Sequence, residues 1–437
     1  MFLVKERTSR MLDIQKRISN TFYAIISLPS TAMGFALSIQ ISALSWLLTT
    51  KYNLDIHEVG IVWAAGPLAG IFGQVIVGLI SDKVWFWGGR RRPFILIGGT
   101  LASLMLLALP NIDVISNMLG IANLLVVAVI VALTLDLSIN ISFNPTRSII
   151  ADVTPEGNPR TKGYTWMQTI SGFFGVLAYV IGATLGNYSL INVGVVLVFL
   201  FSVVPMFFVT EAKELIVETS TEQTQKTVTE WGQLWRIYIA HGFSWIGVQT
   251  MFVFIIAFIQ QKMMTGIEPS DATALSGQII AISFAVLNTV GFILPAFVLE
   301  PIAEKIGRVR VHMLAVAIMS LGYFGIVAFA STAMSMYLFM AICGIGWASI
   351  VSLPFAIMSE KVDKSRMGFF MGIFNLSVVL PQLLVSLLVG KFILDAENKN
   401  IIFIISGISL ALSALFWLLV KEQRGADGAP KSFTSSH

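Results

Sequence analysis

The sequence predicts an all-α membrane protein with twelve transmembrane helices in two pseudo-symmetric halves of six. Only 12% of the 437 residues are charged and 56% are hydrophobic, whereas soluble domains carry about 25% charged residues. Apolar segments of about 20 residues recur along the chain, and each is long enough to cross a hydrocarbon core of about 30 Å. Loop charges and short motifs also repeat between the two halves.

Each predicted span is an apolar segment bounded by polar or charged loops. In the first half the spans cover residues 22–49, 58–81, 94–110, 119–144, 163–186 and 190–209. In the second half they cover residues 234–261, 274–299, 311–330, 334–358, 367–394 and 400–420. Lysines and arginines test this count, because cytoplasmic loops carry an excess of them. With both termini in the cytoplasm, the outer loops hold just Lys51, Lys262, Lys391 and Lys399.

A polar stretch rich in threonine, glutamate and glutamine separates the halves and is expected to be a cytoplasmic linker. The expected organisation is a six-helix bundle over 1–210, the linker over 211–232, a second bundle over 233–425 and a flexible tail over 426–437. Parallel half-repeats of this kind are typical of secondary transporters, whose substrate site lies near the midplane. The protein is expected in the inner or plasma membrane, as a monomer.

Several classes of function lack their required residues. The single cysteine, Cys343, excludes an intramolecular disulfide and a cysteine metal cluster. The four histidines are scattered, and no nucleophile elbow, Walker loop or nucleotide fingerprint is present. The basic residues lie in short loops rather than along one face, which argues against nucleic-acid binding. We therefore expect no enzyme, no metal and no cofactor other than a coupling ion.

Asp136 is the most informative residue, because it lies inside a long apolar segment. A carboxylate near the middle of a membrane helix costs roughly 2.5–3.5 kcal/mol, so such residues usually mark an ion or substrate pathway. Removal from water favours the protonated form of a carboxyl group, and a nearby guanidinium favours the ionised form. A residue between these pressures suits proton coupling. There are two alternatives: a neighbouring residue neutralises Asp136 in a purely structural pair, or Asp136 is a ligand of sodium.

Arg147 is a candidate partner of Asp136 or of a substrate. At about 100° per residue, Asp136, Asn140, Asn144 and Arg147 fall on one face of a helix. Pro145 is expected to disturb regular hydrogen bonding near Asn144 and to turn this region toward a cavity. The alternative is that Arg147 extends to the membrane interface near the end of its helix.

Carboxamides inside the spans suit a polyhydroxylated ligand, because each both donates and accepts hydrogen bonds. Tryptophans present flat apolar faces that suit sugar C–H groups. Both residue types also serve helix packing and the interfacial belt. The candidate substrate residues of these two types are Gln40, Asn140, Asn144, Gln168, Gln249, Asn375 and Gln382, with Trp63 and Trp245.

Charged residues in equivalent loops of the two halves are expected to form a conformational latch that holds one access state. The first loop pairs an aspartate with an arginine cluster, and a weaker copy follows the eighth span. The predicted latch residues are Asp82, Arg90, Arg91, Arg92, Asp152, Glu304 and Arg308. The alternative is a set of topology anchors, since arginines there also satisfy the positive-inside rule.

Three motifs resemble the sucrose-transporter group of the glycoside–pentoside–hexuronide branch of the major facilitator superfamily. They are Gly89-Arg-Arg-Arg-Pro-Phe-Ile95, the series of Asp136, Asn140, Pro145, Arg147 and Asp152 in the fourth span, and Asn375-Leu-Ser-Val-Val-Leu-Pro-Gln382 in the eleventh. The resemblance implies the twelve-helix fold of that superfamily and a proton-coupled symporter of a glycoside such as sucrose or maltose. It further implies that Asp136 accepts the proton and that Arg147 supports substrate binding.

The chain also departs from that group. Val75 stands where the group has proline, and the charged residues of the seventh span are replaced around Trp245, Gln249 and Phe252. These departures affect the expected sugar more than the expected coupling. The short termini and linker favour a bacterial member. Alternatives are a sodium-coupled carrier or exporter of another glycoside-like solute, and a non-transporting sugar sensor.

Overall fold

The computed structural model describes residues 18–70, 80, 84–154, 158–211, 229–359, 361–362 and 367–422. Within these residues every regular element is a helix, and one isolated β-bridge, between Phe86 and Gly89, closes a turn. Ten helical segments are long and apolar enough to cross a membrane, and Ile401–Trp417 is a shorter apolar helix. The second predicted span lies partly outside the described residues. The all-α class is confirmed, and the protein is a multi-pass membrane protein.

The chain divides into two compact units, which are described separately. The first takes in Met1–Leu47 and Ala65–Ser220, and the second takes in Leu48–Ala64 and Thr221–His437. The start of the second predicted span thus groups with the second unit. The predicted division of the chain at a linker over 211–232 stays a prediction.

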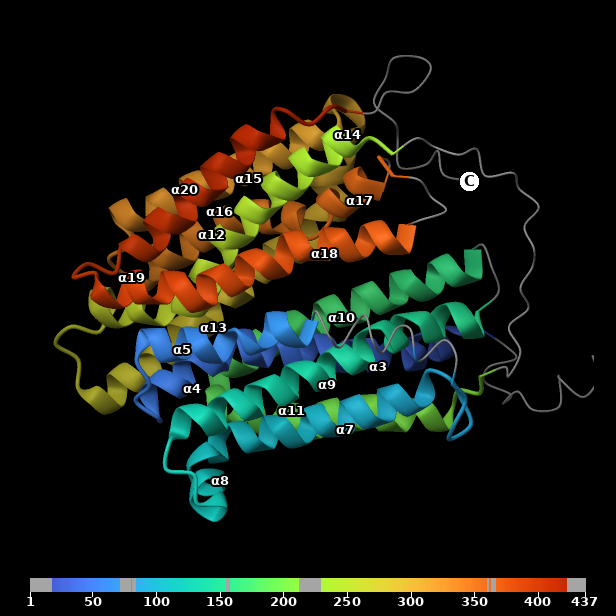
Figure 1. The fold of residues 1–437 in the computed structure, drawn as a ribbon, viewed down its shortest axis with the longest axis horizontal. Coiled ribbons are helices and arrows are strands. Elements are labelled where there is room, and N and C mark those ends of the chain that lie inside the picture. Colours follow the sequence, from blue (N-terminus) through green and yellow to red (C-terminus); the bar gives the residue numbers. More distant parts are fainter. Residues whose placement is uncertain are drawn as a thin grey trace, which may run out of the picture. The chain divides into compact units, whose positions relative to one another are not determined.

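In the first unit, α3 packs against α10 and α11, and α7 packs against α9 and α11 (Figure 1). Close approach is possible because a glycine faces a serine between α7 and α9: a methyl group at Gly98 would meet the Ser142 hydroxyl. The elements are α3 (Asn20–Ile39), the π-helical turn η1 (Gln40–Leu44), the first half of α4 (Ser45–Thr50), whose residues from Leu48 on group with the second unit, α7 (Arg92–Ala108), the 3₁₀ turn η2 (Leu109–Asn111), α8 (Ile112–Leu119), α9 (Leu124–Val153), α10 (Asn158–Leu185), α11 (Asn187–Val203) and the 3₁₀ turn η3 (Val204–Phe207).

In the second unit, α12 packs against α20 and α18, α15 packs against α16 and α20, and α5 packs against α19, η6 and α12 (Figure 1). The elements are α5 (Ile56–Trp63), α12 (Trp231–Met263), α13 (Pro269–Leu294), the π-helical turn η4 (Pro295–Leu299), α14 (Glu300–Ile306), α15 (Arg308–Phe329), α16 (Ala333–Ile350), α17 (Leu353–Ser359), α18 (Met367–Leu384), the π-helical turn η6 (Val385–Val389), α19 (Gly390–Asp395) and α20 (Ile401–Trp417).

The fourth span differs from its predicted bounds at both ends. Helix α9 begins after Asn123, whose side chain accepts a hydrogen bond from the Leu125 backbone, and it continues through Pro145 to Val153. Pro145 is accommodated inside the helix, and its predicted effect in orienting the region around Asn144 toward a cavity stays a prediction. A proline removes one backbone donor from a helix, and in a long membrane helix the flanking hydrogen bonds can hold the axis. Asp136, Asn144 and Arg147 consequently share one unbroken helix.

Candidate functional site

Asp136 lies inside the first unit and is bonded to a side chain from another span. Gln40 Nε2 donates a 2.9 Å hydrogen bond to Asp136 Oδ2, and the two side chains are 3% and 4% exposed. Among the described residues no lysine or arginine forms an ion pair with Asp136. The carboxyl group is therefore held by a neutral amide, and the predicted alternative of neutralisation by a basic residue has no support here.

Local backbone structure explains how Gln40 reaches the carboxyl group. Gln40 is the first residue of η1, where the α3 helix widens into a π-helical turn before α4. Such turns carry one extra residue and occur frequently at functional sites. The widened turn shifts the faces of the helix after Ile39 relative to those before it. We attribute the inward position of Gln40 to this shift.

A third span reaches Asp136 through a glycine. A Cβ atom placed on Gly66 would lie 3.4 Å from both Asp136 Oδ1 and Oδ2. Because Gly66 has no side chain, its backbone borders the carboxyl group directly, and the space that a methyl group would fill is left beside the carboxylate oxygens. The first, second and fourth spans thus meet at Asp136.

Arg147 lies too far from Asp136 to form an ion pair. The two residues share a face of α9, but eleven residues of helix rise by about 16 Å. The exposed Arg147 guanidinium instead lies over the Phe143 ring, 4.3 Å from its centroid, and its backbone carbonyl accepts a 3.3 Å bond from the Tyr164 hydroxyl. Sequence reasoning counted angles around the helix and overlooked the rise along it.

Asn140 and Asn144 lie between Asp136 and Arg147 on α9, and their surroundings differ from those of Arg147. Asn140 Nδ2 donates a 2.8 Å bond to the backbone carbonyl of Asp136, so this amide group contacts the Asp136 backbone rather than its carboxylate. Asn144 is half-buried one turn further along. Gln168, on α10 of the same unit, is exposed. The first unit therefore carries Gln40, Asp136, Asn140, Asn144, Arg147 and Gln168.

The remaining predicted substrate residues belong to the second unit. Gln382 Nε2 donates a 3.3 Å bond to Gln249 Oε1, which joins α18 to α12. Trp245 Nε1 donates a 3.0 Å bond to His241 Nε2 one turn before it. Trp63 is buried on α5, and Asn375 is half-buried on α18. Sequence reasoning placed no role on His241, although a histidine four residues before a tryptophan on one helix is a readable hydrogen-bonding pair.

Two of the predicted latch residues form an ion pair within the first unit. Arg91 Nε lies 3.2 Å from Asp152 Oδ2 and joins the start of α7 to the end of α9. Asp82 and the side chain of Glu304 lie outside the described residues. The role of these charges in holding an access state stays a prediction.

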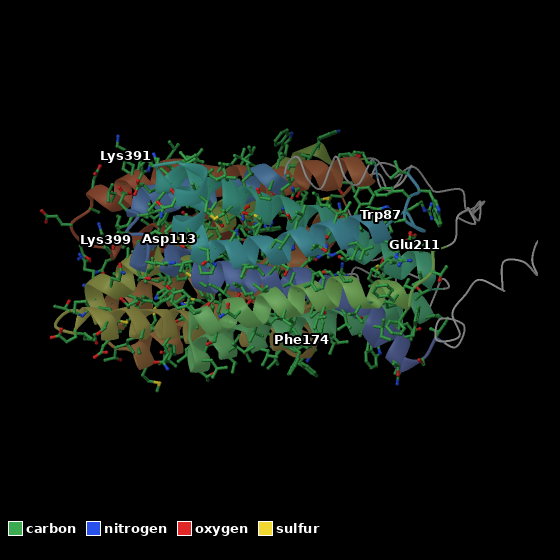
Figure 2. The ribbon with its side chains drawn as sticks, turned by 90° about the horizontal axis from the view of Figure 1, so that it is seen from below. Trp87, Asp113, Phe174, Glu211, Lys391 and Lys399 are labelled. Carbon is green, nitrogen blue, oxygen red and sulfur yellow. The ribbon has the colours of Figure 1, made fainter. Side chains whose placement is uncertain are left out.

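Glu211 was missed as a partner of the arginine cluster. Its carboxylate accepts bonds from the backbone N–H groups of Arg90, Arg91 and Arg92, at 2.8, 2.9 and 2.7 Å. These are the unsatisfied donors at the start of α7, where the helix dipole also favours a negative charge. Trp87, in the turn before them, and Glu211 lie at one end of the first unit, and Asp113 lies at the other (Figure 2).

The second half contains the same arrangement. Glu422 accepts bonds from the backbone N–H groups of Arg308, at 3.1 Å, and Val309, at 2.9 Å, at the start of α15. A Cβ atom on Gly89 would clash with the Glu211 carboxylate, and one on Gly307 would clash with that of Glu422. The signal was present in the sequence: Val209-Thr-Glu211 follows the sixth span, and Val420-Lys-Glu422 follows the twelfth.

Comparisons with known proteins agree with this architecture. The family model described as Major Facilitator Superfamily matches residues 27–386. The sucrose transport protein SUC4 of Arabidopsis thaliana is 25% identical over 431 residues, which cover 83% of this chain and 82% of that protein. The general alpha-glucoside permease of Schizosaccharomyces pombe is 29% identical over 191 residues, covering 40% of this chain and 34% of that protein.

Solved structures show the same fold. The nucleoside transporter NupG matches with a TM-score of 0.70 at 12% identity, over 93% of this chain and 100% of that one. A D-xylose-proton symporter matches with a TM-score of 0.67 at 14% identity, over 90% of this chain and 96% of that one. At these identities the likeness concerns the fold alone.

Proposed function

The chain belongs to the Major Facilitator Superfamily, and we propose that it is a secondary active transporter that carries a sugar across the membrane together with a proton. The observation that carries this proposal is the buried Asp136 carboxyl group, which Gln40 holds and with which no cation among the described residues pairs. The sugar class is supported by the relatives named as sucrose transport proteins and an alpha-glucoside permease.

Asp136 is the proposed proton site. An ionised carboxylate without a cation beside it is costly inside a membrane, and uptake of a proton removes that cost. In the ionised form the carboxylate accepts the Gln40 N–H bond. In the protonated form its O–H needs an acceptor, and rotation of the Gln40 carboxamide presents Oε1 for that purpose. Gln40, first expected to bind substrate, is therefore assigned to the proton step.

Arg147 is the proposed substrate contact on the same helix. Its guanidinium is exposed and lies over the Phe143 ring, which restricts the orientations of the side chain. A planar guanidinium offers several fixed donors, which suit adjacent sugar hydroxyls. Asn144 and Gln168 supply further amide groups in the same unit. The distance of about 16 Å between Arg147 and Asp136 means that the sugar and proton affect each other through a change of conformation.

Alternating access supplies that change. A carrier accumulates its substrate when sugar and proton each bind the inward-facing and outward-facing states unequally. The steep asymmetry of loop charges supports cytoplasmic termini in the inner or plasma membrane. A monomer suffices for this mechanism.

The purified chain in proteoliposomes tests the proposal. Sucrose, maltose and other disaccharides are offered in counterflow, first without a gradient and then with an inward proton gradient or an inward sodium gradient. We expect exchange of at least one disaccharide without a gradient and its accumulation with the proton gradient. Absence of disaccharide exchange under every condition would overturn sugar transport. Accumulation with the sodium gradient alone would show that the coupling ion is sodium and not the proton.

A further inference from the structure

A groove of about 660 Å³ lies in the second unit, where α15 begins and α20 ends. Its walls come from the end of α14, the first two turns of α15, the last residue of α20 and the residues that follow it. The lining is mostly apolar and carries three charged residues. The lining includes Arg310, Leu314, Trp417, Leu418, Lys421 and Glu422.

The charges in this groove favour an anion. Arg310 and Lys421 are exposed, and their side chains make no hydrogen bond or ion pair with any residue that the structure describes. The Glu422 carboxylate is already engaged, because its two oxygens accept the backbone bonds from Arg308 and Val309. Arg310 and Lys421 are therefore available to a ligand, whereas the Glu422 carboxylate is bonded to the backbone at the start of α15.

The apolar part of the groove continues onto exposed apolar side chains of α15 and of the residues just after α20. Leu314 is 48% exposed on α15, and Leu418 is 63% exposed just beyond α20. Helix α15 is long and apolar enough to span a membrane and begins at this level, and the shorter apolar helix α20 ends there. Charged groups at the end of a span with apolar side chains below them match the boundary between phospholipid headgroups and acyl chains.

Trp417 also lines the groove. Its side chain is fully buried, and its indole N–H has no hydrogen-bond partner among the described residues. The His312 ring lies edge-on to it at 4.4 Å and does not accept this hydrogen. Its place in the lining makes Trp417 an internal fluorescent probe of the groove.

The first half lacks one of the two cations. Arg310 follows Gly307 by three residues, and its counterpart three residues after Gly89 is Arg92. Lys421 directly precedes Glu422, whereas the residue directly before Glu211 is Thr210. The pair of cations is therefore a property of the second half and is not required by the capping arrangement that the halves share.

We propose that this groove binds an anionic phospholipid, with the phosphodiester held by Arg310 and Lys421 and an acyl chain against Leu314 and Leu418. Basic pockets between membrane helices recognise such headgroups through charge and hydrogen bonding. The site is independent of the transported solute.

Quenching of tryptophan fluorescence by lipids with brominated acyl chains tests the site. The full chain is reconstituted in phosphatidylcholine vesicles with increasing fractions of brominated phosphatidylglycerol, or of brominated phosphatidylcholine as the reference. The difference between the native protein and Trp417→Phe isolates the Trp417 signal. We expect phosphatidylglycerol to quench that signal at lower fractions than phosphatidylcholine does.

Substitutions of the two cations then measure their contribution. A basic residue near an anionic headgroup contributes about fivefold in affinity, so Arg310→Gln and Lys421→Thr each reduce the preference for phosphatidylglycerol by about that factor. Lys391→Gln is the control, because this exposed lysine lies near the opposite end of α20, which is about 25 Å long (Figure 2). It should keep the full preference.

Three outcomes would overturn the proposal. The first is an unchanged preference in the Arg310→Gln, Lys421→Thr double variant, which then shows that the cations do not hold the headgroup. The second is displacement of the lipid by millimolar glycerol phosphate, which indicates a site for a soluble anion. The third is no selective quenching of Trp417 in the native protein, which would show that no anionic lipid occupies the groove. Equal melting temperatures of all variants in phosphatidylcholine would show that they are folded.

Discussion

Gln40 donates a hydrogen bond to Asp136 across 96 residues of sequence, and this bond connects the first span to the fourth. Both side chains are buried, and the bond replaces the ion pair with Arg147 that the shared helix face had indicated. A neutral partner leaves the charge of the carboxyl group uncompensated. The protonation of Asp136 can therefore control whether that region of the first unit carries a net charge.

Asp136→Asn should abolish accumulation of sugar and preserve exchange. The amide has nearly the same shape as the protonated carboxyl group but cannot release a proton. We expect the accumulation ratio under a proton gradient to fall to about one, while counterflow stays within severalfold of the native rate. Asp113→Asn, at the end of the first unit that faces away from Glu211, serves as the control. Uphill uptake by Asp136→Asn at the native level would refute the assignment.

Gln40→Leu should move the pH dependence of uptake to higher pH. The Gln40 N–H bond is available to the ionised carboxylate, so its loss disfavours ionisation and lets the proton bind at lower proton concentration. A hydrogen bond to a charged group is roughly twice as strong as one to a neutral group, so the loss of Gln40 weakens the ionised form more than the protonated one and we expect a shift of less than about one pH unit. Asn140→Ala is the matched control, because that amide contacts the Asp136 backbone carbonyl. Equal pH profiles for native protein and Gln40→Leu would contradict the role of Gln40.

The charged and titratable groups on the helices around this site are few. Within α3 and η1 the sequence offers Tyr23 as the one titratable side chain, and α9 adds Arg147 and Asp152 toward its end. Helix α7 has Arg92 at its first position, and α11 has Tyr188 near its start. Helix α10 holds Arg160, Lys162, Tyr164 and Tyr179. A shift on Gln40 substitution is therefore best assigned to Asp136.

Gly66→Ala should slow uptake without unfolding the protein. The added methyl group would lie 3.4 Å from both carboxylate oxygens, a distance that the fold can accept but that removes the space beside them. We expect a severalfold lower initial rate of proton-driven uptake. Gly34→Ala is the control, because a Cβ there meets nothing within 4 Å. If both alanine variants transport at the same rate, access past Gly66 is unimportant.

Arg147→Lys should raise the KM for sugar and leave the pH profile unchanged. Lysine keeps the charge but loses the planar set of donors, and its ammonium group covers the Phe143 ring less well. We expect KM to rise by about tenfold, equivalent to about 1.4 kcal/mol. The separation from Asp136 explains why the pH profile should not move. A shifted pH profile with an unchanged KM would place Arg147 in the proton step instead.

Gly89→Ala and Gly307→Ala should each lower stability, because each methyl group displaces the carboxylate that caps a helix. Loss of these bonds leaves two or three backbone donors without a partner, and we expect a cost of about 1–3 kcal/mol at each site. Gly307 has a φ of +95°, which adds strain for alanine. Thermal unfolding in detergent measures the effect, with Gly232→Ala as a control in open space. Three equal melting temperatures would contradict the capping role.

The sequence was sufficient for the helical class, the order of the spans and the importance of Asp136, because these depend on hydrophobicity and on the cost of a buried charge. It did not reveal the Gln40 bond, since the position of Gln40 depends on a π-helical turn that no residue pattern marks. The end of the fourth span was also missed, because the apolar segment was predicted to stop at residue 144 whereas α9 continues to Val153.

The capping bonds of Glu211 change where the chain can be divided into two separately expressed pieces. Glu211 was expected to begin the linker, yet its carboxylate completes the start of α7, more than a hundred residues earlier. A cut placed before this residue would give a first piece whose third span has an uncapped end. A cut after it would leave each piece with its own glutamate, since Glu422 does the same for α15. Split-gene complementation should therefore tolerate a break just beyond Glu211 better than one just ahead of it.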